Sequence, residues 1–446
     1  MVGDNVSLIY NFFFLSSNSI LMDRQKRSTR NPQPPVSPIK SKAKQSVTKK
    51  TVKVQKTTKP AGVELSLPNT TVGHVFVVGS GDCAQLGLGP DIFEKERPAK
   101  IEYFDDLDIV YIAAGGLHTI ALSLSGKLYS WGCNDQKALG RSGEESEPAP
   151  VEGLDNEFIT SVACGDSVSV ALTKFGQVYA WGTFRGTNGI FGFAPGIETQ
   201  PTPKLIPELK NIVQIGAGTN HLVALAKDGK IFTWGIGEQG QLGRKVVARH
   251  AFEASLIPRP VNFRPYRKTA KFPLVFCGGY HTILVHETNT IFTFGLNNYG
   301  QLGLGDLDEH DIPDMVEGID GTSDVIKSVG GGEHFTTVLT EEGKVYVFGR
   351  NDSGQLGLPS EEAKEHCSTA KLLSVPPIKS LSCGSAFTLA VTQTGDVYAW
   401  GYGEMGQLAN ESEDAPEPFQ IELKGREVLM ASGGGQHTVM LIKPKE

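Results

Sequence analysis

Cysteine and long apolar runs are both scarce in this sequence. It has six cysteines in 446 residues, with no C-x-x-C spacing, which excludes a disulfide-stapled scaffold and favours a reduced, intracellular compartment. The apolar run from Val6 to Leu15 is shorter than the ~20 residues that cross a bilayer. No Lys or Arg precedes that run, so it does not have the form of a secretory signal either. We therefore expect no membrane partner.

The motifs of common enzyme classes are also missing. The sequence has no G-x-S-x-G nucleophile elbow, no H-E-x-x-H zinc site and no G-x-x-x-x-G-K-[ST] phosphate loop. We expect a protein that performs no bond chemistry and needs no metal and no cofactor. Glycine, in contrast, is plentiful at 52 residues, and these do not fall at every third position, which excludes collagen. Many glycines without low complexity suggest a repeated, turn-rich unit.

The net charge of −7 conceals a basic arm on an acidic body. Residues 23–60 hold twelve Lys or Arg against one acid, with five prolines and no aromatic residue, a composition that predicts a disordered tail. Such a tail either binds DNA and a nuclear import receptor or merely aids solubility. The DNA contacts predicted in it are Lys26, Arg27, Lys49 and Lys50. Residues 1–22 are an apolar extension ahead of a second possible start, Met22, and their role stays open.

A repeat fills residues 61–446. Seven segments combine a short apolar strand, a glycine turn and usually Gln-Leu-Gly; they start at Gly73, Gly126, Gly176, Gly229, Asn289, Gly343 and Gly395. Each is followed about forty residues later by a second strand of the type seen in residues 113–122, AAGGLHTIAL. The starts are 53, 50, 53, 60, 54 and 52 residues apart, and this regularity predicts one repetitive domain.

The strands indicate the architecture. Segments such as 345–348 (VYVF) and 397–400 (VYAW) are β-branched or aromatic on both faces, which is typical of strands buried on both sides. Small sheets stacked radially meet this condition, so the prediction is an all-β, seven-bladed β-propeller. A propeller of the WD type is disfavoured because its repeat is shorter and ends in Trp-Asp. An open solenoid is disfavoured because neither end has an obvious polar cap.

These residues carry a family resemblance. The doublet of a VYxWG…GQLG strand and a GxxHTxAL strand, seven times over, resembles the regulator of chromosome condensation family. The resemblance implies a seven-bladed propeller over residues 61–446. Its founding member is the nucleotide exchange factor for the Ran GTPase, which implies the same activity here, on chromatin in the nucleus. Fold alone does not imply function, since such propellers also serve as modules of scaffold proteins.

The third repeat departs from the others in a way that favours exchange. In place of Gln-Leu-Gly it has a run that resembles the β-wedge of the Ran exchange factor, and its predicted exchange residues are Thr183, Phe184, Arg185, Asn188, Gly189, Ile190 and Phe191. Two glycines and an Asn beside apolar Ile190 and Phe191 are compatible with a protruding hairpin. The alternative is a repeat eroded by drift.

A basic insertion in the fourth repeat favours chromatin binding. Residues 244–271 hold eight Lys or Arg against Glu253 alone. The resemblance implies that this loop meets the acidic histone surface of a nucleosome, with Arg244, Lys245 and Arg249 as the predicted contacts. The alternative is a solvated loop.

Histidine recurs at one repeat position, which we assign to His118, His221, His281, His334 and His437. Equivalent positions on seven blades lie too far apart for one metal ion. The residues are either structural or line a face that docks the GTPase. The resemblance implies GTPase contacts at Asp82, Asp166, Asn220, His221, His334 and His437. Asn220 stands where the family tends to have Asp, which leaves its contact in doubt.

Two function classes therefore remain. The first is a guanine nucleotide exchange factor for the Ran GTPase that acts on chromatin. The second is a non-catalytic propeller scaffold that binds chromatin or other proteins. A propeller enzyme is a distant third. Release of labelled GDP separates the first two classes.

Overall fold

A computed structural model describes residues 62–245, 252–261, 263, 271–316, 318–319, 325–359, 361, 365–411 and 413–445. Almost all of its regular structure is β-strand. None of the helices in these residues is long and apolar enough to cross a membrane. The predictions for residues 1–22, for the basic tail of residues 23–60 and for Arg249 lie outside the described residues.

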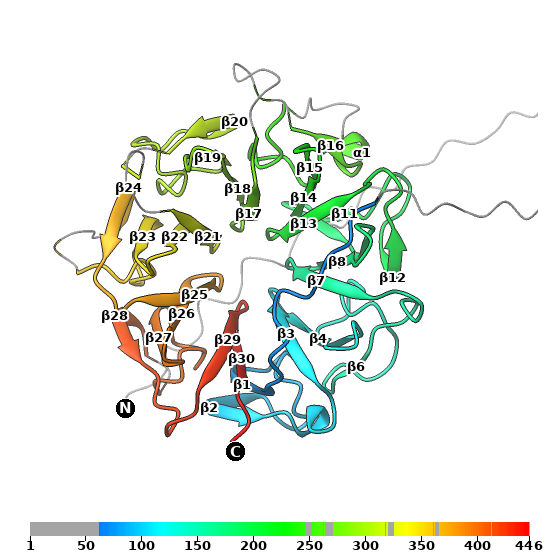
Figure 1. The fold of residues 1–446 in the computed structure, drawn as a ribbon, viewed down its shortest axis with the longest axis vertical. Coiled ribbons are helices and arrows are strands. Elements are labelled where there is room, and N and C mark those ends of the chain that lie inside the picture. The colour runs from blue at the N-terminus through cyan, green and yellow to red at the C-terminus, as the bar shows by residue number, and fades with distance from the viewer. Residues whose placement is uncertain are drawn as a thin grey trace, which may run out of the picture. The chain divides into compact units, whose positions relative to one another are not determined.

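Seven four-stranded antiparallel sheets surround a central axis, as Figure 1 shows. The predicted seven-bladed β-propeller is thus confirmed. We call the blade that contains both ends of the domain blade A. The other six are lettered B to G in chain order. From the axis outward, blade A holds β29 (Val428–Gly433), β30 (His437–Ile442), β1 (His74–Ser80) and β2 (Glu94–Lys100).

The other six blades follow in chain order. Blade B holds β3 (Ile109–Ala114), β4 (His118–Ser123), β5 (Leu128–Gly132) and β6 (Ala149–Pro150). Blade C holds β7 (Ile159–Cys164), β8 (Val168–Thr173), β9 (Val178–Gly182) and β12 (Gln200–Leu205). Blade D holds β13 (Ile212–Ala217), β14 (His221–Ala226), β15 (Ile231–Gly235) and β16 (Arg259–Pro260).

Blade E holds β17 (Leu274–Cys277), β18 (His281–Val285), β19 (Ile291–Gly295) and β20 (His310–Met315). Blade F holds β21 (Ile326–Gly331), β22 (Phe335–Thr340), β23 (Val345–Arg350) and β24 (His366–Leu373). Blade G holds β25 (Ile378–Cys383), β26 (Phe387–Thr392), β27 (Val397–Gly401) and β28 (Ala415–Gln420). The remaining elements are a 3-10 turn at Glu102–Phe104, the helix α1 (Phe252–Ser255) and the hairpin strands β10 (Phe184–Gly186) and β11 (Gly189–Gly192).

Sequence repeats and blades are out of phase. Each repeat supplies the two outer strands of one blade and the two inner strands of the next. The first repeat consequently meets the last in blade A, where β1 pairs with β30 from His74↔Ile442 to Gly79↔His437. In Figure 1 the blue N-terminal strands lie beside the red C-terminal strands. Backbone pairing between the two ends of the domain closes the ring and removes the open ends of a solenoid.

The hydrophobic core lies between the blades. Seven apolar clusters each combine residues of two adjacent blades, such as Ile120 of blade B with Val162 of blade C. The aromatic residue of the VYxW strand is fully buried in such clusters, as at Trp181 and Trp400. Trp181 also donates its indole N–H to the carbonyl of Ala138 in the preceding blade, at 2.7 Å. The inter-blade core explains why these strands are apolar on both faces.

Candidate functional site: a hairpin beside the axial mouth

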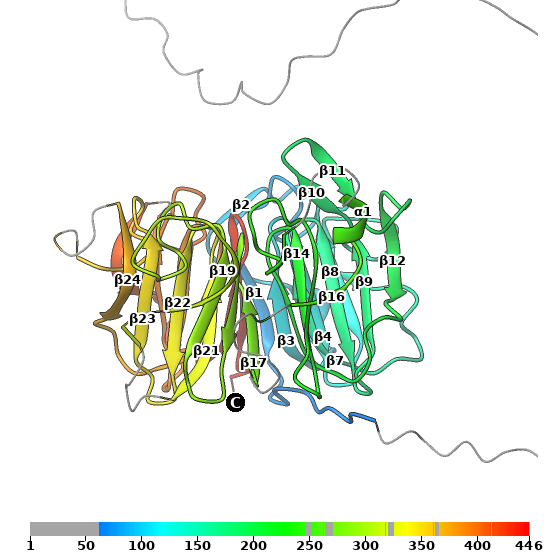
Figure 2. The same ribbon diagram turned by 90° about the horizontal axis from the view of Figure 1, so that it is seen from above.

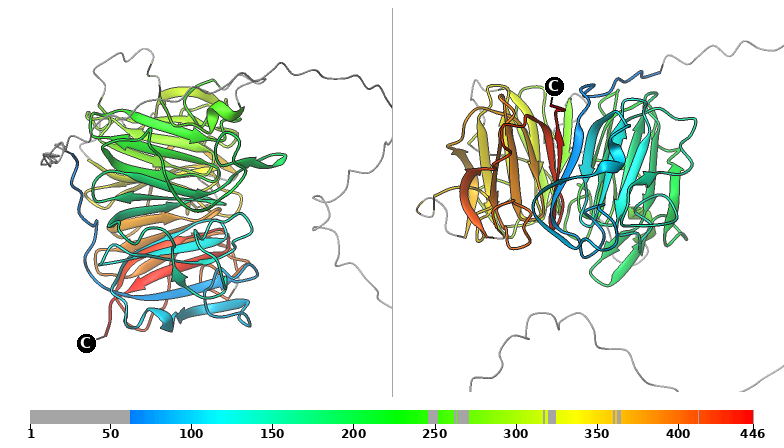
Figure 3. Two further views of the ribbon diagram at one scale, coloured as in Figure 1. Left: turned by 90° about the vertical axis from the view of Figure 1, so that its right-hand side faces the viewer. Right: turned by 90° about the horizontal axis from the view of Figure 1, so that it is seen from below.

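A two-stranded hairpin interrupts blade C where the third repeat departs from the others. Strands β10 and β11 pair through Phe184↔Gly192, Arg185↔Ile190 and Gly186↔Gly189. Figures 2 and 3 show the hairpin standing out from one end of the blades. We call this end the hairpin face. The described chain begins, at residue 62, on the opposite face.

Alternating side chains root the hairpin and present its tip. Phe184 and Phe193 are buried in the cluster between blades C and D, and Phe191 packs against that cluster. Ile190 points the other way and is 44% exposed. Gly189 closes the turn at φ = +105°, a conformation in which a side chain would be strained. The predicted hairpin is therefore present, anchored by three aromatic rings and tipped by one exposed aliphatic side chain.

Residues of the ring hold the base of the hairpin. The Asn220 side-chain oxygen accepts the backbone N–H of Arg185 at 2.7 Å. The Arg185 guanidinium extends toward Asp166, with Nη1 4.0 Å from the Asp166 carboxylate. Asn220 thus supports the hairpin, and an Asp at this position has the oxygen needed to accept the same bond. Thr183 is buried and its hydroxyl donates to the Glu198 carbonyl at 2.6 Å.

A closed circle of backbone hydrogen bonds surrounds the axis at the hairpin face. Seven N–H groups each donate to a carbonyl of the neighbouring blade: Gly116 to Gly165, Asp166 to Thr219, Thr219 to Gly279, Gly279 to Gly332, Glu333 to Ser385, Ser385 to Gly434 and Gly435 to Gly116, at 2.7–3.1 Å. Glycines permit this close approach; a Cβ at Gly115 would lie 2.3 Å from the Gly165 oxygen. The glycine excess of the sequence serves the axis in this way.

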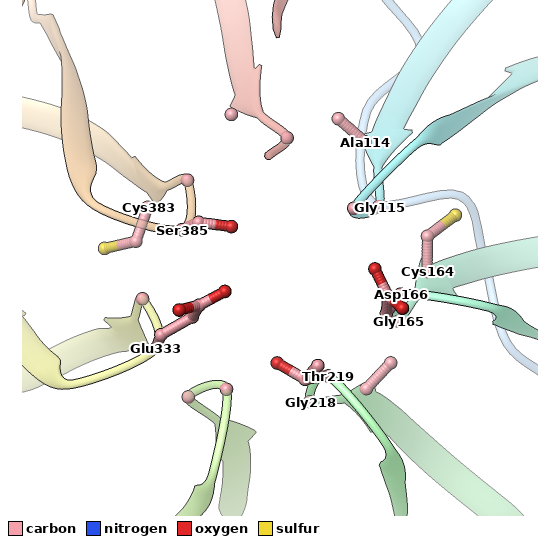
Figure 4. A pocket seen from close by; sticks show the side chains of 18 of the residues that line it. Ala114, Gly115, Cys164, Gly165, Asp166, Gly218, Thr219, Glu333, Cys383 and Ser385 are labelled. Atoms are coloured by element: carbon pink, nitrogen blue, oxygen red, sulfur yellow. The ribbon is translucent and has the colours of Figure 1, made fainter. Parts of the chain in front are cut away.

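The circle frames a small cavity of about 110 Å³, which we call the axial mouth. Four polar side chains, Asp166, Thr219, Glu333 and Ser385, point into it, and Figure 4 shows them converging from four blades. Burial raises the pKa of both Asp166 and Glu333. The pKa of Tyr280 is raised to about 12, first by its burial and then by the negative charges of Glu333 and Asp166. The mouth is therefore an acidic, partly desolvated surface beside the hairpin.

Four of the five predicted corner histidines do not reach this face. His118, His221, His281 and His437 are completely buried, and each Nε2 lies 2.7–2.9 Å from a hydroxyl of the next blade, on Ser169, Thr282, Thr336 and Thr119 respectively. The first three hydroxyls donate their own proton to a backbone carbonyl at 2.8 Å. Nε2 must therefore be the donor to the hydroxyl. We call these four contacts the histidine clasps.

The clasps correct the prediction for His221 and His437, whose side chains join blades and leave no group for a GTPase. Burial lowers the pKa of His118 to about 4 and that of His221, His281 and His437 to about 3. All four are consequently neutral at physiological pH. The structural interpretation of these histidines is the correct one.

His334 was placed one position out of register by the sequence. Phe335 pairs with Gly349 as His221 pairs with Gly235, so Phe335 occupies the clasp position. His334 precedes it, on the hairpin face, where it stacks on Tyr280 with ring centroids 5.5 Å apart. Burial and the nearby Arg350 lower its pKa to about 4. His334 thus lies at the hairpin face, and its contact with a GTPase stays a prediction.

The predicted nucleosome contact at Arg244 is also corrected. Its guanidinium turns inward, and Nη1 donates to the Thr233 carbonyl at 3.0 Å and to the Thr233 hydroxyl at 2.6 Å. Arg141 contacts the Ser130 carbonyl in the same way in blade B. These two blades have two-residue fourth strands, whereas the other fourth strands have six to eight residues. The arginine therefore supplies donors that a longer strand would provide.

The other predicted residues differ in exposure. Lys245 is exposed, with its ammonium 3.6 Å from the Asp311 carboxylate, and it stays available at the surface. Asp82 is exposed in the β1–β2 loop and lines a separate cavity with Asp135, Glu144 and Glu145.

Sequence reasoning missed Glu333, Thr219 and Ser385. The signal was a polar residue at a corner where other repeats have glycine.

Comparison with known proteins places this arrangement in a family. A model described as RCC1-like domain matches residues 74–440. The chain belongs to this family. The human protein named Regulator of chromosome condensation is 37% identical over 392 residues, which cover 85% of this chain and 92% of the relative. The yeast (Saccharomyces cerevisiae) guanine nucleotide exchange factor SRM1 is 32% identical over 430 residues, covering 82% of this chain and 86% of the relative.

A solved structure agrees with the RCC1-like fold. Prp20p from Saccharomyces cerevisiae, described with its binding properties to Gsp1p and histones, superposes with a TM-score of 0.78 at 31% identity. The match covers 86% of this chain and 94% of Prp20p. The RCC1-like fold is thus shared with a solved structure, and the hairpin and the axial mouth are the features of this chain from which a function can be argued.

Proposed function

We propose that this RCC1-like propeller is a guanine nucleotide exchange factor for the Ran GTPase, and that the β10–β11 hairpin is its exchange wedge. The observation that carries the proposal is the hairpin itself. Among the described residues it is the only two-stranded sheet added to a blade. It combines a buried aromatic root with an exposed Ile190 tip. A relative that bears the name of a guanine nucleotide exchange factor, SRM1, supports the assignment.

The mechanism needs only binding energy. A GTPase holds its nucleotide through a phosphate-binding loop and Mg²⁺. A factor that binds the nucleotide-free conformation more tightly lowers nucleotide affinity by that difference. Acceleration of release by about 10⁵-fold requires about 7 kcal/mol at the transition state. In this proposal the hairpin displaces the phosphate-binding region.

The hairpin face supplies the remaining contacts. Asp166 and Glu333 give the axial mouth negative charge, and His334 lies on the same face. Carboxylates in a partly desolvated mouth attract a cationic side chain of a partner more strongly than they would in bulk water. The acidic mouth would therefore orient the GTPase while the hairpin acts on its nucleotide site.

Release of labelled GDP from Ran tests the assignment. The unmodified protein is expected to accelerate release strongly, and a variant with Arg185→Ala and Asn188→Ala is expected to lose most of that acceleration. A normal melting temperature of the variant would show that it is folded. Unchanged rates in the folded variant would refute the wedge. The rival function, a non-catalytic scaffold, predicts that even the unmodified protein has no effect on GDP release.

Chromatin association is the second part of the proposal. The acidic body carries exposed Lys245 and the basic tail of residues 23–60, two elements that suit DNA and the acidic histone surface. The family relation to a protein described as binding histones supports this part. Removal of residues 23–60 is expected to weaken DNA binding and to flatten its dependence on salt. An unchanged salt slope would contradict the role of the tail.

A further inference from the structure

One residue of blade D reaches the tip of the blade C hairpin. The Thr187 hydroxyl, at the tip, donates to Glu238 Oε2 at 3.1 Å. A Cβ built on Gly186 would lie 3.6 Å from Glu238 Oε1, so the carboxylate sits beside the hairpin backbone. Glu238 belongs to the loop that follows β15. The bond thus connects two blades across 51 residues of sequence.

Equivalent residues in other blades contact their own loops. Asn298 accepts from Gln301 at 3.1 Å, Asp352 accepts from Gln355 at 3.1 Å, and Glu404 accepts from Tyr402 at 3.2 Å. Each of these bonds stays within three residues of its acceptor. Glu238 differs because its carboxylate extends to a neighbouring blade. The difference occurs next to blade C, which carries the β10–β11 hairpin.

A hairpin this short needs such support. It has three paired positions, and an isolated two-stranded hairpin is only marginally stable in water. Its root is fixed by aromatic packing and by the bond from Arg185 to Asn220. Without a contact at the tip, residues 187–190 would be held only through the two short strands. The Thr187–Glu238 bond supplies that contact.

We propose that Glu238 is a positioning residue that holds the hairpin tip in the orientation required for nucleotide release. This inference rests on the proposed exchange function and adds that blade D sets the geometry of the wedge. A tip that is already ordered loses less conformational entropy when it enters the GTPase. Removal of the brace should therefore slow the release step itself and leave docking of the propeller face largely intact.

The test measures GDP release from Ran over a range of exchange-factor concentrations, which separates the maximal rate from the half-saturating concentration. Glu238→Ala is expected to lower the maximal rate about three- to tenfold, the effect of one hydrogen bond, with half-saturation within about twofold of the unmodified protein. Glu238→Gln retains an acceptor oxygen of the same reach and should restore the rate. Thr187→Val should match Glu238→Ala, and the double variant should be no slower than either.

Glu404→Ala is the matched control, because it removes an equivalent carboxylate from a blade without a hairpin. It should leave both kinetic parameters unchanged. A maximal rate for Glu238→Ala within twofold of normal, or a Glu238→Gln variant as slow as Glu238→Ala, would overturn the brace. If the Arg185→Ala, Asn188→Ala variant is slow in the same assay, the brace alone is wrong. If that variant is also normal, the wedge fails and the brace fails with it.

Discussion

Adjacent residues at the blade corners have different roles, and Asn220 and His221, both buried, are the clearest pair. His221 is completely buried and joins blade D to Thr282 of blade E. Asn220 lies on the hairpin face and supports the backbone of Arg185. His334 and Phe335 repeat the contrast in blade F, where the phenyl ring is buried and the imidazole stacks at the surface.

The contrast follows from strand geometry. Successive side chains of a strand point to opposite sides, so the residue that starts the second strand enters the seam between blades while its predecessor stays at the corner. The recurring histidine position therefore indicates a residue that packs between two blades. Among the residues that vary from blade to blade, Asp166 and Glu333 line the axial mouth and Asn220 holds the base of the hairpin. In this propeller the repeated position stabilises the ring and the irregular one is a candidate for function.

Acidification should destabilise the fold through the buried histidines of the clasps. An unfolded histidine has a pKa near 6.5, whereas burial lowers the pKa of His221, His281 and His437 to about 3. Between these values the unfolded chain binds more protons than the folded one, so stability is retained above pH 6.5 and falls as the pH drops. At pH 5 the cost is about 2 kcal/mol for each clasp. Denaturant unfolding at pH 7.5, 6 and 5 measures the loss.

Two carboxyl groups have the opposite effect on stability as the pH falls, so a histidine variant is needed to make the test specific. Burial raises the pKa of Asp166 and Glu333, so protonation of these carboxyls favours the folded state as the pH falls. A variant with His221→Phe and His281→Phe should show a shallower decline of stability between pH 6.5 and pH 5. An equally steep decline in that variant would mean that the clasps are not the source of the acid sensitivity.

Asn220 offers a smaller and cleaner effect. Asn220→Ala removes the acceptor for the Arg185 N–H, and we expect about a tenfold slower release of GDP from Ran with little change in melting temperature. Asn220→Asp keeps an acceptor oxygen and should remain close to normal. His221→Ala is the matched neighbour; it should lower the melting temperature distinctly because it leaves a buried hydroxyl without its donor and opens a cavity.

The reverse pattern would contradict the division of roles. If Asn220→Ala lowered the melting temperature as much as His221→Ala, Asn220 would be part of the ring's structure. If Asn220→Asp were as slow as Asn220→Ala, the amide group itself would be needed, and the bond to Arg185 would not explain its effect.

The sequence predicted the ring because its determinants are local and repeated. Strands that are apolar on both faces, glycine turns and a near-constant spacing all recur seven times, so an error in one repeat does not alter the result. The hairpin could be predicted for the opposite reason, since it is the one place where the third repeat departs from the pattern. Both predictions needed only comparison of the chain with itself.

What the sequence could not supply were contacts between blades. His334 was misplaced because a histidine stands one residue before the buried corner position, which Phe335 occupies in this blade. The corner has the same length as that of blade D, and the pairing of Phe335 with Gly349 fixes the register. The buried role of Arg244 depends on the two-residue length of β16, which no motif records. Glu238 was missed because its loop resembles the others until the neighbouring hairpin is placed beside it.

Arg244 and Lys245, at the start of the basic insertion, give the smallest predicted effects. They are a second pair of adjacent residues of which one points into the blade and the other is exposed. Arg244→Met should leave nucleosome affinity within about twofold and lower the unfolding free energy by about 1–3 kcal/mol, because the Thr233 carbonyl loses its charged donor. Lys245→Glu should leave stability unchanged and weaken nucleosome binding about three- to tenfold at low salt, with less effect at high salt. Binding titrations and unfolding curves on both variants measure the two outcomes. A loss of nucleosome affinity in Arg244→Met without loss of stability would show that the guanidinium leaves the blade to bind its partner, and the assignment of buried and exposed roles would then fail at this pair.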